Sequence, residues 1–206
     1  MSAALHVLPS GLKVVVDPVP GLRTLAVAVM ADGGARHEDE ARSGWSHLLE
    51  HMVFKGAGGR SARELIERVE AVGGNLNAAT GQERTTFTAR VLAGDLELAL
   101  ATLSDLVFRP TLDAEELERE KGVVAQEIAE AYDAPDDHVF ELAQGKAFEG
   151  QPIGRPILGS NESLAGADRD RMEAWRARLY APERMCLSVS GAVREDDLLT
   201  LAERWF

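Results

Sequence analysis

Hydrophobic positions in several short stretches of the chain recur at every second residue, which is the period of a β-strand. Leu25, Val27 and Val29 alternate with Ala and Met side chains until a glycine pair ends the run. The segment 13–16 is instead a mostly β-branched run, closed by turn-forming residues. These signals predict strands at about residues 13–16, 25–30, 75–80, 84–92 and 185–191.

Other stretches follow the period of an α-helix. Trp45, Leu48 and Met52 share one face of a predicted helix whose expected N-cap is Ser43. Ser61 begins the next helix as part of a capping box. Further helices are predicted at about residues 96–107, from 113 onward, at 137–148, at 168–179 and at 198–206. Strand pairs interleaved with helices predict an α+β fold, in which a mainly antiparallel or mixed β-sheet packs with several α-helices.

The chain length of 206 residues suits one domain of generous size, and we expect a single domain over residues 1–206. The last predicted helix carries an apolar stripe from Leu198 to Trp205, and no cap or polar tail follows it. This pattern favours a junction with a missing half of the molecule over a natural helical terminus.

Composition excludes several classes of protein. The chain has 22 Lys and Arg against 34 Asp and Glu, a net charge of −12, which argues against a nucleic-acid partner. Its single cysteine, Cys186, cannot form an internal disulfide, and this favours a reducing compartment. No signal peptide is visible, and no apolar run approaches the ~18 residues that span a membrane. We therefore expect a cytoplasmic protein with no membrane partner.

Candidate chemistry lies on the helix that begins near residue 45. His47 and His51 are four residues apart, so both imidazoles project from one helical face and can converge on a metal ion. Glu50 lies beside them, in the His-x-x-Glu-His order of an inverted zincin. The alternative is a chance pair of surface histidines. A three-ligand zinc site needs one more His or carboxylate from elsewhere in the chain.

The acidic segment 113–141 offers candidates for that third ligand, although most of its carboxylates are expected to be solvated. Glu127 differs because its helical neighbours are apolar, and an unpaired charge there would be costly without a cation. Those neighbours are Val123, Val124 and Ala131. Glu120 shares nearly the same azimuth, and Glu130 is a weaker candidate at the edge. The alternative role for Glu127 is a salt bridge between packed helices.

The segment 44–56 resembles the signature of the pitrilysin/insulinase family of zinc metallopeptidases, which includes the mitochondrial processing peptidases. That family places a third zinc ligand, a glutamate, about 75 residues downstream, and the match falls on Glu127. A further family glutamate corresponds to Glu120. The resemblance extends to residues 74–80, 152–159 and 180–185. The chain departs from it at Ala57, where the family usually has threonine.

The resemblance implies a metallopeptidase/LuxS-like fold and a zinc ion held by His47, His51 and Glu127. Zinc would lower the pKa of a water molecule and polarise the scissile carbonyl, while Glu50 would take the proton and pass it to the leaving amine. Glu120 would orient a ligating histidine or balance the local charge. A LuxS-like lyase reaction is disfavoured because the matching motifs are those of the peptidases.

Family members bind substrate as an added β-strand, which maps here to Asn77, Ala78 and Ala79. The side chain of Asn77 would face the peptide, and the alternative is that it stabilises a turn. The family builds its chamber from two halves, so the resemblance implies an N-terminal catalytic half whose homologous second half, or partner subunit, is absent. A net charge of 2 − 11 = −9 over residues 113–141 predicts basic, flexible peptide substrates. The alternative function is a noncatalytic structural or substrate-binding subunit.

Overall fold

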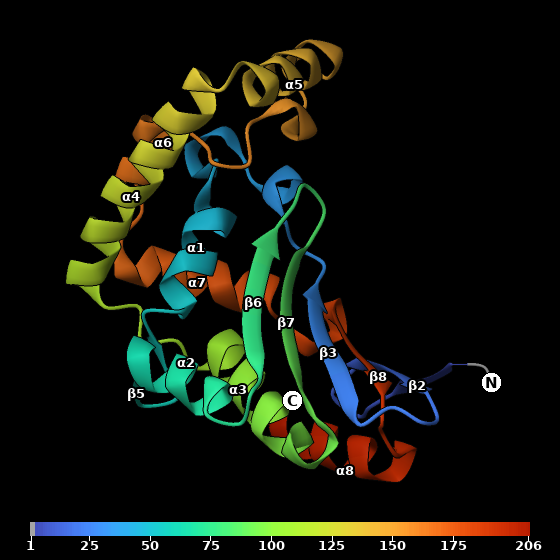
Figure 1. The fold of residues 1–206 in the computed structure, drawn as a ribbon. Helices are drawn as coiled ribbons and strands as arrows, with labels where there is room; N and C mark the ends of the chain where they lie inside the picture. Colours follow the sequence, from blue (N-terminus) through green and yellow to red (C-terminus); the bar gives the residue numbers. More distant parts are fainter. Residues whose placement is uncertain (1–2) are drawn as a thin grey trace.

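The computed structural model describes residues 3–206, in which a six-stranded mixed β-sheet is covered by helices on one face (Figure 1). The strand order is β1-β2-β8-β3-β7-β6, and neighbouring strands are antiparallel except for the parallel pair β2 and β8. The strands are β1 (Ala4–Val7), β2 (Lys13–Pro18), β3 (Thr24–Ala31), β6 (Asn75–Thr80), β7 (Thr85–Leu92) and β8 (Met185–Gly191). A separate small hairpin pairs β4 (Gly56–Ala57) with β5 (Arg60–Ser61).

The helices account for most of the remaining described residues. They are α1 (Trp45–Val53), α2 (Ala62–Glu70), α3 (Leu96–Phe108), α4 (Ala114–Asp133), α5 (Pro135–Ala147), α6 (Asn161–Ala165), α7 (Arg169–Leu179) and α8 (Glu195–Trp205). The predicted α+β class is confirmed, together with each strand and long helix that the periodicity indicated. None of the helices among residues 3–206 combines the length and apolar character needed to cross a bilayer.

The alternation in β3 explains which face of the sheet is buried. Leu25, Val27 and Val29 are each at most 2% exposed, and they face the helices. Tyr180, just after α7, packs edge-on against Phe87 of β7 and joins the same core. The helices therefore pack on the face of the sheet that carries the alternating large apolar side chains predicted from the sequence.

Three short elements escaped the sequence prediction: β1, the β4–β5 hairpin and α6. Each has at most five residues, too few for a hydrophobic period to be recognised. The expected N-cap of α1 was also wrong by one residue, because the cap is Gly44 rather than Ser43. Gly44 has φ +86°, and a Cβ there would lie 2.4 Å from the carbonyl oxygen of Leu158, so the close approach of another loop selects glycine.

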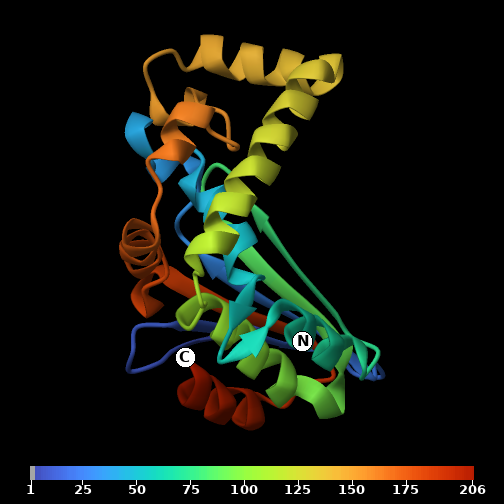
Figure 2. The ribbon, with the colours of Figure 1, turned by 90° about the vertical axis from the view of Figure 1, so that its left-hand side faces the viewer.

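The long helix α4 packs across α1 and then extends beyond the sheet. At its far end the chain turns sharply into α5 (Figure 2). Asp113 begins α4 by accepting hydrogen bonds from the backbone N–H groups of Glu115 and Glu116. α5 starts at Pro135, two residues before the predicted start, because proline is favoured in the first turn of a helix. This crossing of α1 and α4 brings together two segments that are about 70 residues apart in the chain.

Candidate metal centre and active site

Helix α1 presents its histidines and Glu50 on the side away from the core. Leu48, Leu49 and Met52 are fully buried, and this fixes the rotation of the helix about its axis. His47 and His51 are consequently half-buried on the opposite side, with their ring centroids 4.6 Å apart. The local spacing therefore gives the two-histidine face that the sequence predicted.

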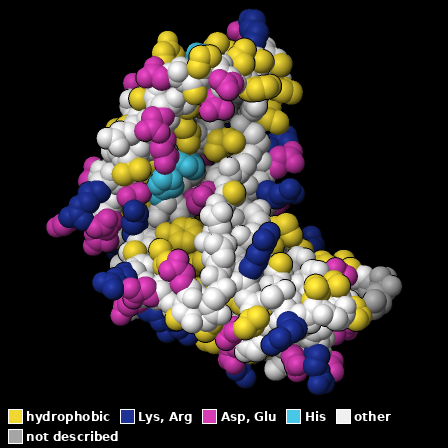
Figure 3. Space-filling view, in the orientation of Figure 1, with side chains coloured by type: hydrophobic (Ala, Val, Ile, Leu, Met, Phe, Trp, Pro, Cys, Tyr) yellow, Lys and Arg dark blue, Asp and Glu magenta, His cyan; other side chains and the backbone are white. Residues whose placement is uncertain are grey.

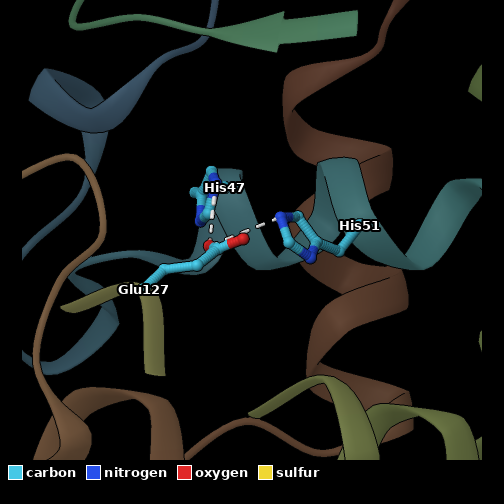
Figure 4. Close-up of side chains that lie close together, drawn as sticks. All are labelled: His47, His51 and Glu127. Atoms are coloured by element: carbon cyan, nitrogen blue, oxygen red, sulfur yellow. Dashed lines mark ion pairs between the residues drawn. The ribbon is translucent and has the colours of Figure 1, made fainter. Parts of the chain in front are cut away.

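Glu127 of α4 reaches this face of α1. Its Oε2 atom lies 3.7 Å from Nε2 of His47 and 3.7 Å from Nε2 of His51 (Figure 4). The three side chains each offer a ligand atom, and these atoms all lie within 4.8 Å of one another. Glu127 Oε2 is buried and has no hydrogen-bond partner among the described residues. Two imidazole nitrogens and one carboxylate oxygen, gathered in this way, fit the donor set of a catalytic zinc site.

Protonation supports the same fit. Burial and the neighbouring His51 lower the pKa of His47 to about 4, so its imidazole is neutral at pH 7 and keeps a free lone pair. Nδ1 of His51 lies 3.0 Å from Oε2 of Glu120 and donates to it, which leaves the Nε2 lone pair of His51 directed at Glu127. Two lone pairs and a carboxylate that face one another repel unless a cation lies between them.

The apolar surroundings that were expected for Glu127 are only half present. Val124 is fully buried, but Val123 is 39% exposed and the Glu127 side chain is 37% exposed. The neighbours that matter are the two imidazoles of α1, which helical periodicity within α4 does not reveal. Glu130, the weaker candidate, is exposed and lies outside the cluster.

Glu120 is buried beneath the cluster, with its side chain 6% exposed. It contacts His51 through Oε2, and its Oε1 atom lies 2.6 Å from Nζ of Lys55. Lys55 supplies the positive charge that a buried carboxylate requires. The sequence analysis missed Lys55, although its place one turn after His51 was an available signal.

Glu50 lies on the wall of a cavity of about 450 Å³ beside His51. One of its oxygens, Oε2, is buried without a hydrogen-bond partner among residues 3–206. The remaining wall is formed by Phe54, Ile66, Glu70, Asn75, Leu76, Asn77 and Ala78. A larger cavity, of about 1130 Å³, lies between α1, α6 and α7 and contains none of the predicted site residues.

The predicted substrate residues lie on β6, which is an edge strand of the sheet. Asn77 and Ala78 line the cavity beside Glu50, whereas Ala79 does not. The side-chain oxygen of Asn77 accepts a hydrogen bond from the backbone N–H of Ala78 at 2.9 Å, so part of its capacity is used locally. The edge is therefore next to the cluster, as a bound strand would require.

Tyr180 is a further residue that the sequence analysis did not select. Its hydroxyl is buried and has no hydrogen-bond partner in the described part of the chain. Burial raises the pKa of this hydroxyl, and the charge of the Glu50 carboxylate raises it further, so the Tyr180 hydroxyl stays protonated at neutral pH. Its position in the segment 180–185, which matched the family, was the available signal.

Acidic side chains surround the histidines on the concave side of the molecule (Figure 3). Exposed carboxylates on α4 and at the start of α5 include Glu130, Asp133, Asp136 and Asp137. Acidic side chains therefore lie on the face that carries the candidate metal centre.

Comparison with known proteins gives consistent relatives. An uncharacterized zinc protease of Bacillus subtilis is 39% identical over 197 residues, which is 96% of this chain and 48% of the relative. A probable mitochondrial-processing peptidase subunit beta of Arabidopsis thaliana is 33% identical over 97% of this chain and 38% of its own length. The chain thus spans about half the length, or less, of the curated relatives it matches.

Solved structures show the same fold. A protease from Helicobacter pylori superposes with a TM-score of 0.94 at 24% identity, over all of this chain and 50% of the other. A structure described as an M16 inactive domain from Pseudomonas fluorescens gives a TM-score of 0.92 at 17% identity, over 99% of this chain and 50% of that one. Residues 13–161 match the family described as insulinase, Peptidase family M16. This match and the zinc-protease relatives show that the chain belongs to the M16 (insulinase) family of peptidases.

Proposed function

We propose that this chain is a zinc-dependent endopeptidase domain that hydrolyses peptide bonds in extended peptides. The observation that carries the proposal is the placing of Glu127 Oε2 3.7 Å from two imidazole nitrogens, beside Glu50 and an edge strand. A peptidase needs a Lewis acid, a proton acceptor and a surface for an extended chain, and these features supply candidates for all three.

The metal would be held by His47 and His51 through Nε2 and by Glu127 through a carboxylate oxygen. When bound, Zn²⁺ supplies polarisation of the scissile carbonyl and lowers the pKa of water. Glu50 accepts a proton at its carboxylate and delivers it to the nitrogen of the leaving amine. Glu120 holds the Nδ1 proton of His51 and so keeps the Nε2 lone pair available.

The substrate would lie along β6 as an additional strand, near Asn77, Ala78 and Ala79. One of its side chains would then enter the cavity of about 450 Å³ between α1, α2 and β6. Phe54 and Ile66 make that cavity largely apolar, and Glu70 adds a carboxylate at its wall. The acidic face around the site favours basic, flexible peptides by attraction of their cationic side chains.

We further propose that residues 1–206 form an N-terminal catalytic domain that works with a homologous second half. The support is that the curated relatives are about twice as long as the segment matched here. On the concave side, the cluster is open to solvent rather than enclosed (Figure 3). A second half would complete the wall around a bound peptide.

The test combines a metal count with a cleavage assay. Elemental analysis of the purified chain should give close to one zinc per chain, and extended peptides should be cleaved when the homologous second half is present. A chain that binds zinc but cleaves no peptide, even with its second half, would identify a noncatalytic subunit. A chain that binds no zinc would contradict the proposed centre.

A further inference from the structure

The helix that carries both histidines has no side-chain cap of its own. Its N-cap is Gly44, which has no side chain, and the first backbone N–H groups of any α-helix lack partners within the helix. Ser61, Asp113 and Asp168 cap the starts of α2, α4 and α7, whereas α3, α5 and α8 resemble α1 in having no side-chain cap from the N-cap residue. At the start of α1, a group from outside the helix accepts two of these hydrogen bonds.

That group is the carboxylate of Glu38, which is 3% exposed. Oε2 of Glu38 accepts from the backbone N–H of Gly44 at 2.7 Å, and Oε1 accepts from that of Ser46 at 2.6 Å. Ser46 directly precedes His47. The carboxylate thus fixes the backbone one residue before the first histidine of the cluster.

An ionised carboxylate is an expensive way to cap this helix. Burial raises the pKa of Glu38 to about 7 from 4.5, and the hydrogen bonds from Ser46 and Gly44, with the nearby Arg155 guanidinium, offset only part of that rise. A buried carboxyl group with a raised pKa resists ionisation in the folded state. Ionising it at neutral pH therefore lowers the stability of the folded chain instead of raising it. Capping for stability alone does not explain why a glutamate occupies this place.

The same turn is tied to the segment that follows α5. The Arg155 guanidinium donates to the backbone oxygen of Glu38. Ser163 Oγ donates to the backbone oxygen of Ser43 at 2.6 Å, and the indole N–H of Trp45 donates to the backbone oxygen of Ser163 at 3.0 Å. Residues 155–163 therefore hold the start of α1 at several points.

The segment 155–163 follows α4 and α5 in the chain, and α4 carries Glu127. One stretch of chain thus supplies the carboxylate of the cluster and also holds the helix that supplies its two imidazoles. A shift of α1 along its axis would change the distances from His47 and His51 to Glu127, so the clamp at the start of α1 bears directly on the metal centre.

We propose that Glu38, held by Arg155, is a positioning residue that sets the place of α1 against α4 and so the distance from His47 to Glu127. The inference rests on the proposed zinc function. Glu38 touches neither the metal ligands nor the cavity. It acts through the backbone of Gly44 and Ser46.

The test compares Glu38→Gln with Asp168→Asn, a matched loss of a capping carboxylate at α7. Zinc affinity is measured by competition with a chelator, and amide hydrogen exchange is followed over residues 44–48. We expect Glu38→Gln to weaken zinc binding about 10- to 100-fold, the range for partners that orient metal ligands, and to speed exchange in this turn. Asp168→Asn should leave the zinc affinity unchanged. In the enzyme with its second half, kcat should fall while KM stays nearly constant.

Arg155→Ala provides a second route should Glu38→Gln fold poorly. It should weaken zinc binding in the same direction, and the double variant should lose less than the sum of the two single losses because the two side chains act together. Unchanged zinc affinity and exchange in folded Glu38→Gln would overturn the inference and leave the zinc function intact. If the wild type binds no zinc, the proposed function fails. Hydrogen exchange over residues 44–48 that is the same in Glu38→Gln as in the wild type would then overturn the positioning role of Glu38 separately.

Discussion

Each ring nitrogen of His51 faces a different carboxylate. Nδ1 lies 3.0 Å from Oε2 of Glu120, and Nε2 lies 3.7 Å from Oε2 of Glu127. The shorter contact is a hydrogen bond that sets the tautomer, and the longer one leaves room for an ion between the two groups. His47 differs, because its Nδ1 is buried and has no partner among the described residues. The two histidines are therefore held in different ways. His51 is held by its contact with Glu120, which in turn pairs with Lys55, whereas His47 is held by packing and by the backbone at the start of α1.

The role of Glu50 gives the first prediction. Glu50→Gln keeps the shape of the side chain but removes the proton acceptor, so turnover should fall by at least about a hundredfold while zinc content stays near one per chain. Elemental analysis and peptide cleavage, in the enzyme with its second half, measure the two effects separately. Wild-type cleavage by a zinc-loaded variant would remove Glu50 from the mechanism.

The third ligand is tested by comparing two glutamates on α4. Glu127→Ala should lose zinc on dialysis because it removes one of three donor atoms, whereas Glu130→Ala should keep it because Glu130 is exposed and outside the cluster. His47→Ala should behave like Glu127→Ala. Full zinc content in dialysed Glu127→Ala would place the third ligand elsewhere, with Glu120 the next candidate.

Lys55 gives a prediction that arises from the structure alone. Lys55→Met removes the cation 2.6 Å from the buried Glu120 carboxylate, which then keeps the hydrogen bond from His51 but has no charged partner among the described residues. Zinc affinity should fall by about tenfold or more, the lower range for such outer contacts. Lys146→Met is the matched control, because Lys146 is exposed and, within residues 3–206, pairs only with Glu149. Equal zinc affinities of Lys55→Met and Lys146→Met, measured by competition with a chelator, would contradict a role for Lys55.

At the scale of elements, the start of α1 predicts a pH dependence of stability. The pKa of Glu38 is raised to about 7 in the folded chain from 4.5, so the folded state binds the proton more tightly than the unfolded state. The stabilising contribution of Glu38 is therefore full below about pH 4.5 and is lost as the pH rises through 7. The change corresponds to on the order of 3 kcal/mol, at about 1.4 kcal/mol per pKa unit.

His47 acts in the opposite direction in the metal-free chain, because its pKa is lowered to about 4 and its contribution is lost as the pH falls. The observable is therefore the difference in unfolding free energy between the wild type and Glu38→Gln, measured by denaturant titration from pH 4 to pH 8. As the pH rises, the wild type should lose unfolding free energy relative to Glu38→Gln. A difference that stays constant with pH would contradict the raised pKa.

Most elements followed from local patterns. The alternation over 24–31, the capping box at Ser61 and the stripe of α1 are properties of neighbouring residues, and the structure confirms the strand and both helices. The cap of α1 was missed because it depends on contacts with Leu158 and Glu38, which lie outside the helix. Short elements such as β1 were missed because four residues hold too few periods.

At the scale of the whole molecule, charge should influence substrate choice. The acidic α4 and α5 border the concave face that holds the histidines, so cationic peptides should be attracted to it (Figure 3). Matched peptides that differ only in Lys and Arg against Asp and Glu near the cut are assayed at low and high salt, with the second half present. The basic set should have the higher kcat/KM, and salt should reduce the difference.

Equal kcat/KM across that peptide set would contradict electrostatic selection. A preference for basic peptides that salt does not weaken would point instead to direct contacts, for example with Glu70 in the cavity. A charge-neutralised variant on the outer surface of α4, such as Glu115→Gln, serves as a control, because Glu115 lies at the other end of that helix from Glu127.

The sequence by itself determined the pairing of His47 with His51, because four residues make about one helical turn and no distant contact is needed. It also determined the fold class, through periods of two and 3.6 residues that select the buried face of each element. Periodicity made Glu127 a candidate beside Glu120 and Glu130, and the family resemblance selected it among them; its local surroundings in α4 are less apolar than expected, because Val123 is exposed. Only the tertiary structure decided that Lys55 holds Glu120, that Glu38 caps α1 and that Glu50 faces a cavity beside β6. The contact of Lys55 with Glu120 joins distant residues because α4 packs against α1, Glu38 is held in its turn by the loop after α5, and the cavity forms where α1, α2 and β6 meet; no periodicity within a single element can specify these arrangements.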